Sequence, residues 1–235
     1  MNNPSATTVI LMIAISILGL YAAGEVNYYS CKSVLESNVD FPVITIPAIG
    51  VNEKINNVSV SQGVYHDNRS FVPANGEIVL YGHRTLQGSP FLRLDQLDYG
   101  DTVTLNWPEI GEINYTVINK TIVPENEELK YSDENSNIFL ITCDPIGSTA
   151  NRLIVEGNMI SINKLNSQII KENPQKYNSL IIIIIFLTFG SIISYFYLKS
   201  NRIYLIATVL TITAILVYFY FFPIPSDIIY SRVIG

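Results

Sequence analysis

Three residues of the chain carry side chains that together fit acyl transfer: Cys143, His83 and Arg152. A cysteine thiolate is a strong nucleophile that forms a thioester when it attacks a carbonyl carbon. An imidazole beside it can keep the sulfur deprotonated or give a proton to the leaving group, and a guanidinium can stabilise developing negative charge. These residue types therefore predict a thiol-dependent acyl-transfer site, if the fold brings them together.

Each of the three lies at the end of an apolar run that resembles a strand. Cys143 ends such a run, and Asp144 and Pro145 interrupt the strand directly after it, so we expect the sulfur at a rim that substrate can reach. Arg152 opens the next apolar run, and an antiparallel hairpin would return it to the neighbourhood of Cys143. Taken singly, the same residues also fit a structural histidine, a buried inert cysteine and a surface arginine.

The remaining histidine, His66, is the rival for a catalytic base. It precedes a polar loop and lacks the sequence context of His83, so we assign it at most to the lining of a substrate-binding pocket. A metal site built from His66, His83 and Cys143 fits the residue types, but their spacing is not that of metal ligands. The chain's other cysteine, Cys31, is interpreted as incidental, with a regulatory disulfide as the alternative.

The middle of the chain predicts a mostly β domain. Short apolar or alternating runs are separated by clusters of Asn, Asp, Gly and Pro, which indicates an antiparallel sheet or a closed barrel. A helical period is limited to residues 89–97, where Phe91, Leu94 and Leu97 recur three residues apart. The predicted strands cover residues 43–47, 77–81, 102–106, 113–119, 138–143 and 153–157.

Three stretches without charged residues, 5–24, 180–198 and 203–226, are long enough to cross a membrane as helices. A cleaved signal peptide is the alternative for the first of them. The predicted organisation is an N-terminal anchor at 1–24, a juxtamembrane linker at 25–40, a folded domain at 41–162, a linker at 163–177, two transmembrane helices at 178–224 and a tail at 225–235.

The loop between the last two predicted helices contains Lys199 and Arg202 and no acidic residue. Short basic loops stay in the cytoplasm, which places the folded domain on the extracellular side of the cell membrane. Residues 25–176 contain 19 acidic residues against 11 Lys and Arg, a net charge of −8, which argues against nucleic acid as a partner.

Several motifs resemble the sortase family, the surface transpeptidases of Gram-positive bacteria and some archaea. Residues 139–143, Phe-Leu-Ile-Thr-Cys, are similar to the Thr-Leu-x-Thr-Cys signature at the end of a sortase strand. Residues 82–85, Gly-His-Arg-Thr, with 88–95 after them, resemble the histidine strand and the short helix that follows it, and 44–51 resemble the opening strand. The resemblance extends over about residues 41–162 and fits a class-E-like or archaeal-type member.

The resemblance implies a closed antiparallel β-barrel with short helices, in which His83, Cys143 and Arg152 are catalytic and Thr142 shapes the substrate pocket. It further implies a transpeptidase that cleaves an LPxTG-like C-terminal sorting signal on surface proteins through a thioester. The acceptor would be an amine on a cell-wall precursor or a pilin-like subunit. A hydrolytic cysteine peptidase with the same residues, and a catalytically silent binding module held in the membrane, are the alternatives.

We expect no cofactor. Some sortases bind calcium through acidic residues in the loop before the cysteine strand, where this chain has a cluster of carboxylates. A solvated acidic loop is the favoured interpretation of that cluster. Its members are Glu125, Glu127, Glu128, Asp133 and Glu134.

Overall fold

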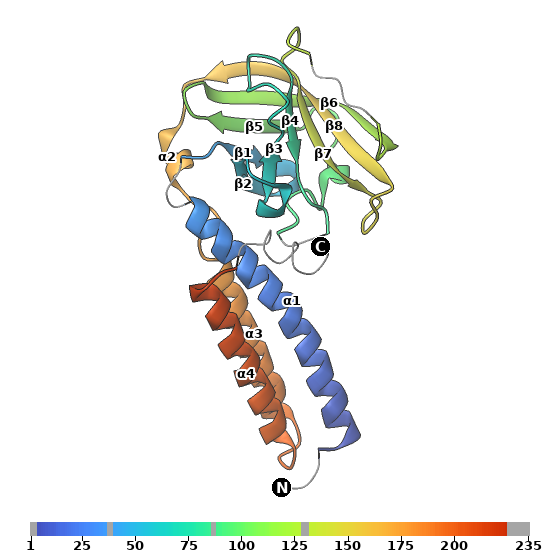
Figure 1. The fold of residues 1–235 in the computed structure, drawn as a ribbon, viewed down its shortest axis with the longest axis vertical. Helices are drawn as coiled ribbons and strands as arrows, with labels where there is room; N and C mark the ends of the chain where they lie inside the picture. The colour runs from blue at the N-terminus through green and yellow to red at the C-terminus, as the bar shows by residue number, and fades with distance from the viewer. Residues whose placement is uncertain (1–3, 37–39, 86–87, 128–131, 225–235) are drawn as a thin grey trace. The chain divides into compact units, whose positions relative to one another are not determined.

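A computed structural model of the chain describes residues 4–36, 40–85, 88–127 and 132–224 (Figure 1). The chain divides into two compact units, one formed by residues 35–174 and the other by the segments before and after it. The predicted C-terminal tail at 225–235 and Glu128 lie outside the described residues.

The first unit is a closed β-barrel with the strand order β1-β2-β3-β4-β7-β8-β6-β5 (Figure 1). The closed barrel that the sequence pattern predicted is thus confirmed. The elements of this unit are β1 (Val43–Ile46), η1 (Pro47–Ile49), β2 (Val51–Asn56), η2 (Val60–Gln62), β3 (Val64–His66), β4 (Ile78–Tyr81), η3 (Leu94–Gln96), β5 (Thr102–Trp107), β6 (Gly111–Pro124), β7 (Ile138–Asp144), β8 (Asn151–Asn163) and α2 (Ser167–Lys171).

Most pairings between the described strands are antiparallel, but β2 pairs with β3, and β4 with β7, in parallel. The sequence pattern did not predict β2 or β3, because β2 carries the charged pair Glu53 and Lys54 and β3 has only three residues. Both charged residues of β2 are nonetheless buried, and the Lys54 ammonium donates to the carbonyl of Glu36 at 3.3 Å.

Alternate residues of the strands fill the inside of the barrel. Phe91, Leu94 and Leu97 from the segment after β4 are fully buried in the same core. We expected a short helix over 89–97, but the described helical structure there is the single 3₁₀ turn η3. A spacing of three residues is the period of a 3₁₀ helix, which places successive apolar side chains on one side.

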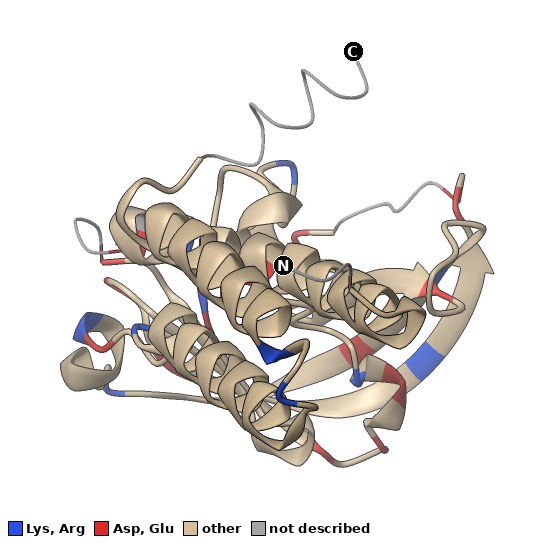
Figure 2. Cartoon of the chain, turned by 90° about the horizontal axis from the view of Figure 1, so that it is seen from below, with Lys and Arg blue, Asp and Glu red and all other residues tan. Residues whose placement is uncertain are grey.

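The second unit contains the helices α1 (Ala6–Glu36), α3 (Asn178–Phe196) and α4 (Arg202–Phe221). All three are long and apolar enough to cross a membrane. In Figure 2 they are mostly free of charged residues along their length. α1 continues past its predicted end at residue 24 into the predicted linker; its 31 residues span ~46 Å at 1.5 Å per residue, more than a hydrocarbon core of about 30 Å.

Small and hydroxylated residues connect the three helices. A Cβ atom at Gly19 would lie 2.5 Å from Ile212, and one at Gly190 would lie 2.7 Å from Val209, so close helix approach requires glycine at both positions. Ser30 donates to Ser179 at 3.0 Å, and Ser179 donates to the carbonyl of Val26 at 3.1 Å. These buried hydrogen bonds join α1 to α3.

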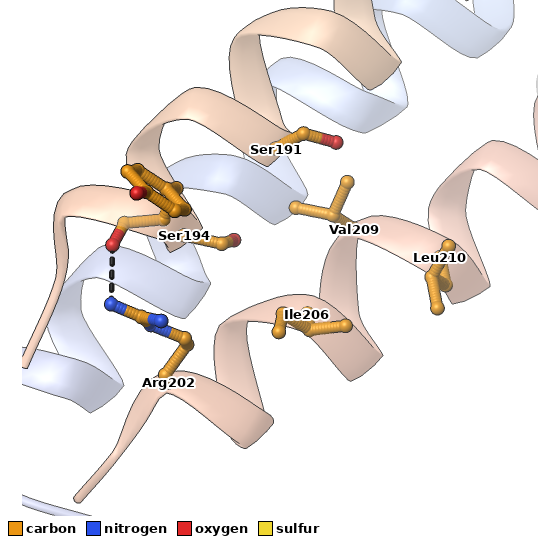
Figure 3. Close-up of a pocket in the computed structure, with 7 residues that line it drawn as sticks. Ser191, Ser194, Arg202, Ile206, Val209 and Leu210 are labelled. Carbon is orange, nitrogen blue, oxygen red and sulfur yellow. Dashed lines mark hydrogen bonds between the residues drawn. The ribbon is translucent and has the colours of Figure 1, made fainter. Parts of the chain in front are cut away.

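A pocket of about 290 Å³ lies between α3 and α4 (Figure 3). At its end, Arg202 donates to the carbonyls of Tyr195 and Tyr197 at the C-terminus of α3, where the backbone carbonyls have no partner within the helix. Its lining, Ser191, Ser194, Tyr195, Arg202, Ile206, Val209 and Leu210, includes none of the residues expected to do chemistry.

Candidate active site

The parallel pairing of β4 with β7 brings His83 and Cys143 together. The two strands are in register up to the pair Tyr81 and Ile141, and the N–H of Gly82 donates to the carbonyl of Ile141 at 3.1 Å. Continuing this register places His83 beside Cys143, on neighbouring backbones that lie about 4.8 Å apart in a sheet. β4 and β7 are neighbours in the barrel (Figure 1); Cys143 is one of the last two residues of β7, and His83 follows the end of β4 by two residues.

Arg152 lies directly opposite Cys143 across the antiparallel pair of β7 and β8. Its Nη1 donates to the Sγ of Cys143 at 3.5 Å, and also to the carbonyls of Thr149 and Asn151 at 3.0 and 3.2 Å. Its Nη2 forms an ion pair with Glu125 Oε1 at 2.5 Å. The expected hairpin is present, and the guanidinium is held between the sulfur and a carboxylate from the end of β6.

The side chains of Cys143 and Arg152 belong to the outer face of the barrel wall. Side chains alternate along a strand, and Leu140 and Leu153 point into the core, so Cys143 and Arg152 lie on the other face. The apolar residues on that face form a separate group, here called the outer cluster. It consists of Val79, Ile141 and Ile154, with Tyr81, Val123 and Phe139 packed against them.

The outer cluster gives the candidate site an apolar neighbour. Ile141 and Ile154 are the next residues along β7 and β8 on the face that carries Cys143 and Arg152. Tyr81 has the same relation to His83 on β4. A peptide carbonyl held at the sulfur would thus lie next to a surface that favours an apolar side chain.

Burial lowers the pKa of His83 below its ordinary value of 6.5, because desolvation disfavours the charged imidazolium. The imidazole is therefore neutral at neutral pH and able to accept a proton. The backbone of His83 is fixed from the other side by Phe91, whose N–H donates to the His83 carbonyl at 3.1 Å.

Thr142 precedes Cys143 in β7, and its side chain points to the face of the strand opposite to that of the sulfur. It is 3% exposed, and its hydroxyl donates to the carbonyl of Gly82 at 2.8 Å. This hydrogen bond links β7 to the segment that carries His83. Thr142 thus fixes the spacing of the two strands, and its side chain does not face the outer cluster.

The structure does not bring His66 to the other three residues. It pairs across β3 and β4 with Leu80, a core residue, and its ring packs edge-on against Trp107 with centroids 5.3 Å apart. Its Nε2 is 3.1 Å from the carbonyl of Phe71. Burial lowers the pKa of His66, although the Phe71 carbonyl and Asp67 act in the opposite direction.

Two charged residues have roles that sequence reasoning missed. Arg84 was noted only within the Gly-His-Arg-Thr motif, yet its side chain is 3% exposed and forms ion pairs with Asp95 and Asp144 at 2.7 and 2.6 Å. Glu125 was assigned to a solvated acidic loop, with calcium binding as the alternative, and the structure pairs it with Arg152. In the part of the chain that is described, no three His, Cys, Asp or Glu residues are grouped as metal ligands.

The chain was compared with models of known protein families and with solved structures. A model of the sortase domain matches residues 35–160. No curated protein sequence matches the chain. Similar solved structures include sortase C-1 from Actinomyces oris, with 28% identity, coverage of 53% of this chain and 76% of that chain, and a TM-score of 0.48.

A lid mutant of sortase A from Corynebacterium diphtheriae has 24% identity, coverage of 53% and 72%, and a TM-score of 0.47. Sortase A from Listeria monocytogenes has 21% identity, coverage of 57% and 98%, and a TM-score of 0.48. Because the sortase-domain match covers more than half of its 235 residues, the chain belongs to the sortase family of cysteine transpeptidases.

Proposed function

We propose that this protein is a membrane-anchored transpeptidase that cleaves an LPxTG-like C-terminal sorting signal and joins the substrate to an amine. The observation that carries the proposal is the contact between the guanidinium of Arg152 and the sulfur of Cys143, at 3.5 Å, beside His83. A nucleophile, a proton carrier and a fixed positive charge thus share one end of three neighbouring strands.

In the first half-reaction, neutral His83 takes the proton of Cys143 and the thiolate attacks a backbone carbonyl of the signal. The carbonyl oxygen becomes an oxyanion, and Arg152 is close enough to the sulfur to stabilise it. When the C–N bond breaks, the imidazolium of His83 gives its proton to the departing amine. The product is a thioester on Cys143.

In the second half-reaction, a primary amine attacks the thioester carbonyl and His83 takes the proton that the amine loses. The C–S bond then breaks, the new amide forms, and the sulfur of Cys143 is regenerated. The acceptor amine belongs to a cell-wall precursor or to a pilin-like subunit. Thr142 supports this chemistry by holding the two strands together through its hydrogen bond to Gly82.

The outer cluster, which runs along β7 away from Cys143, supports a signal with an apolar residue a few positions from the cleaved bond. Tyr81, Val123 and Phe139 are partly exposed on the face that carries Cys143, whereas Ile141 is buried beneath them. Burial of one leucine side chain against such a surface contributes about 1.5–3 kcal/mol. The leucine of an LPxTG-like signal fits this position.

The three apolar helices support a place in the cell membrane, with the barrel on the extracellular side. The orientation rests on the basic loop with Lys199 and Arg202. Enzyme, sorting-signal protein and lipid-linked amine would then be confined to one surface, which raises their effective concentration.

The test is a peptide-transfer assay with the full chain in lipid nanodiscs, a panel of LPxTG-like peptides and an added primary amine. We expect the amine-linked peptide as the main product, and no product from Cys143→Ala. If water replaces the amine at every amine concentration, the chain is a hydrolase. If no peptide reacts although the sulfur remains reactive to alkylating agents, the proposed substrate class is wrong.

A further inference from the structure

Arg84 is a buried arginine that connects three segments around the candidate nucleophile. Its side chain is 3% exposed, and its Nη1 lies 2.6 Å from Asp144 Oδ1 and 3.5 Å from the carbonyl oxygen of Cys143. Its Nη2 lies 2.7 Å from Asp95 Oδ1, and its Nε donates to the carbonyl of Leu92 at 3.3 Å. The guanidinium therefore joins the segment after β4, the region of η3 and the end of β7.

A charge buried to this degree is retained only where its partners compensate for lost hydration. Two carboxylates and two carbonyls surround Arg84. The Asp144 side chain is 20% exposed and belongs to the residue that follows the nucleophile in β7, so its negative charge lies one residue from Cys143 unless it is neutralised. Arg84 provides that neutralisation.

Arg84 does not belong to the face that reacts. Arg84 follows His83 in the sequence, and Asp144 follows Cys143. Because consecutive side chains of a strand point to opposite faces, Asp144 and its ion pair with Arg84 lie on the face of β7 opposite to the sulfur. Other charged or titratable groups lie on the face of β7 that carries the sulfur. Arg152 contacts the sulfur from β8, Glu125 pairs with Arg152, and His83 follows the end of the neighbouring strand β4.

We propose that Arg84 is a positioning residue for the acyl-transfer site: it compensates the charge of Asp144 and fixes the end of β7, which carries Cys143, to the segment that follows His83. The proposal rests on the proposed function only in taking Cys143 as the nucleophile. It assigns to Arg84 no contact with substrate, which separates it from Arg152.

The test measures alkylation of Cys143 by iodoacetamide as a function of pH, in the full chain in detergent. Peptide mass spectrometry separates Cys143 from Cys31, which serves as an internal reference. Arg84→Gln leaves the carboxylate of Asp144 without its buried counter-charge, one residue from Cys143, so we expect the midpoint of the alkylation profile to rise by about one pH unit. Arg93→Gln, at an exposed arginine of the same segment, should leave it unchanged.

Removing the carboxylate of Asp144 should shift the midpoint of the alkylation profile in the opposite direction. Asp144→Asn removes one negative charge near Cys143, while Arg84 keeps its ion pair with Asp95, so the midpoint should fall. In the double variant Arg84→Gln, Asp144→Asn it should return toward the wild-type value. A merely structural role would not produce shifts of opposite sign or their cancellation, and Asp144→Asn carries the test if Arg84→Gln does not fold.

The proposal is overturned if the Arg84→Gln midpoint stays at the wild-type value in folded protein, if Asp144→Asn raises it, or if the double variant keeps the full shift. Because alkylation needs no peptide, these outcomes do not depend on the sorting signal. Shifts of the expected sign without any peptide transfer would contradict the proposed function and leave the role of Arg84 standing.

Discussion

Cys143 and Arg152 face each other across β7 and β8, with the Nη1 of the arginine 3.5 Å from the sulfur of the cysteine. Neither residue reaches the other through a flexible loop, because both belong to paired strands. The position of the guanidinium relative to the sulfur is thus set by backbone hydrogen bonds, which is the kind of preorganisation that favours transition-state stabilisation.

Replacing Arg152 tests that stabilisation. Arg152→Ala should lower the rate of transpeptidation by roughly a hundredfold or more, since losing one donor to an oxyanion costs about 3–4 kcal/mol. Arg152→Lys should recover little of it, because an ammonium lacks the planar fork that contacts Sγ and Glu125 together. Rates and melting temperatures would be compared with those of Arg93→Ala. Near wild-type turnover of Arg152→Ala would remove the arginine from the site.

Glu125 holds the other end of the same guanidinium. Its side chain is 51% exposed, so Glu125→Gln should change the free energy of unfolding by about 1 kcal/mol or less. We expect a fall in transpeptidation that is smaller than that of Arg152→Ala, because Thr149 and Asn151 still accept from Nη1. Steady-state rates measure it, with the exposed neighbour Glu127→Gln as control; an equal loss in both variants would contradict a specific role.

The lowered pKa values of His83 and His66 allow a prediction of how the stability of the fold depends on pH. Burial lowers the pKa of both His83 and His66 below 6.5, so the unfolded chain binds protons more readily than the folded one as the pH falls through this value. The free energy of unfolding should therefore decrease below about pH 6.5 and level off once the folded imidazoles also titrate. Urea unfolding at a series of pH values checks it, and His66→Gln should show a shallower decrease than the wild type. An unchanged slope would contradict burial of a neutral His66.

Orientation in the membrane has a direct readout. In intact cells, an impermeant thiol reagent should label a cysteine placed at the exposed Asn158 in the barrel and should not label one placed at Ser200 in the basic loop. Both variants would be made with Cys31→Ser and Cys143→Ala, so that the introduced cysteine is the chain's single thiol, and opened cells provide the control for Ser200. Labelling at Ser200 and not at Asn158 would reverse the orientation and separate the enzyme from its proposed substrates.

The sequence alone predicted the part of the site that is formed by segments close to each other along the chain. The hairpin that returns Arg152 to Cys143 follows from two apolar runs and the break at Asp144 and Pro145, and the structure has it. The placement of His83 beside Cys143 depends on the parallel pairing of β4 with β7. Nothing in either run alone specifies that partner, because strands far apart in sequence pair through the whole barrel.

The features that were missed have a similar cause. Arg84 is buried because Asp95 and Asp144 reach it from separate segments, and an arginine is otherwise expected at the surface. α1 continues beyond residue 24 although Glu25 and Lys32 end the apolar stretch, since charged residues limit a membrane span and do not end a helix.

The central claim is that the sulfur of Cys143 becomes covalently linked to the substrate. Mass spectrometry of the intact full chain, quenched in acid during reaction with an LPxTG-like peptide, measures this directly. We predict an acyl-enzyme adduct that fragmentation assigns to Cys143, absent in Cys143→Ala and discharged by added amine. An adduct on Cys31, or an adduct that persists in Cys143→Ala, would contradict the account.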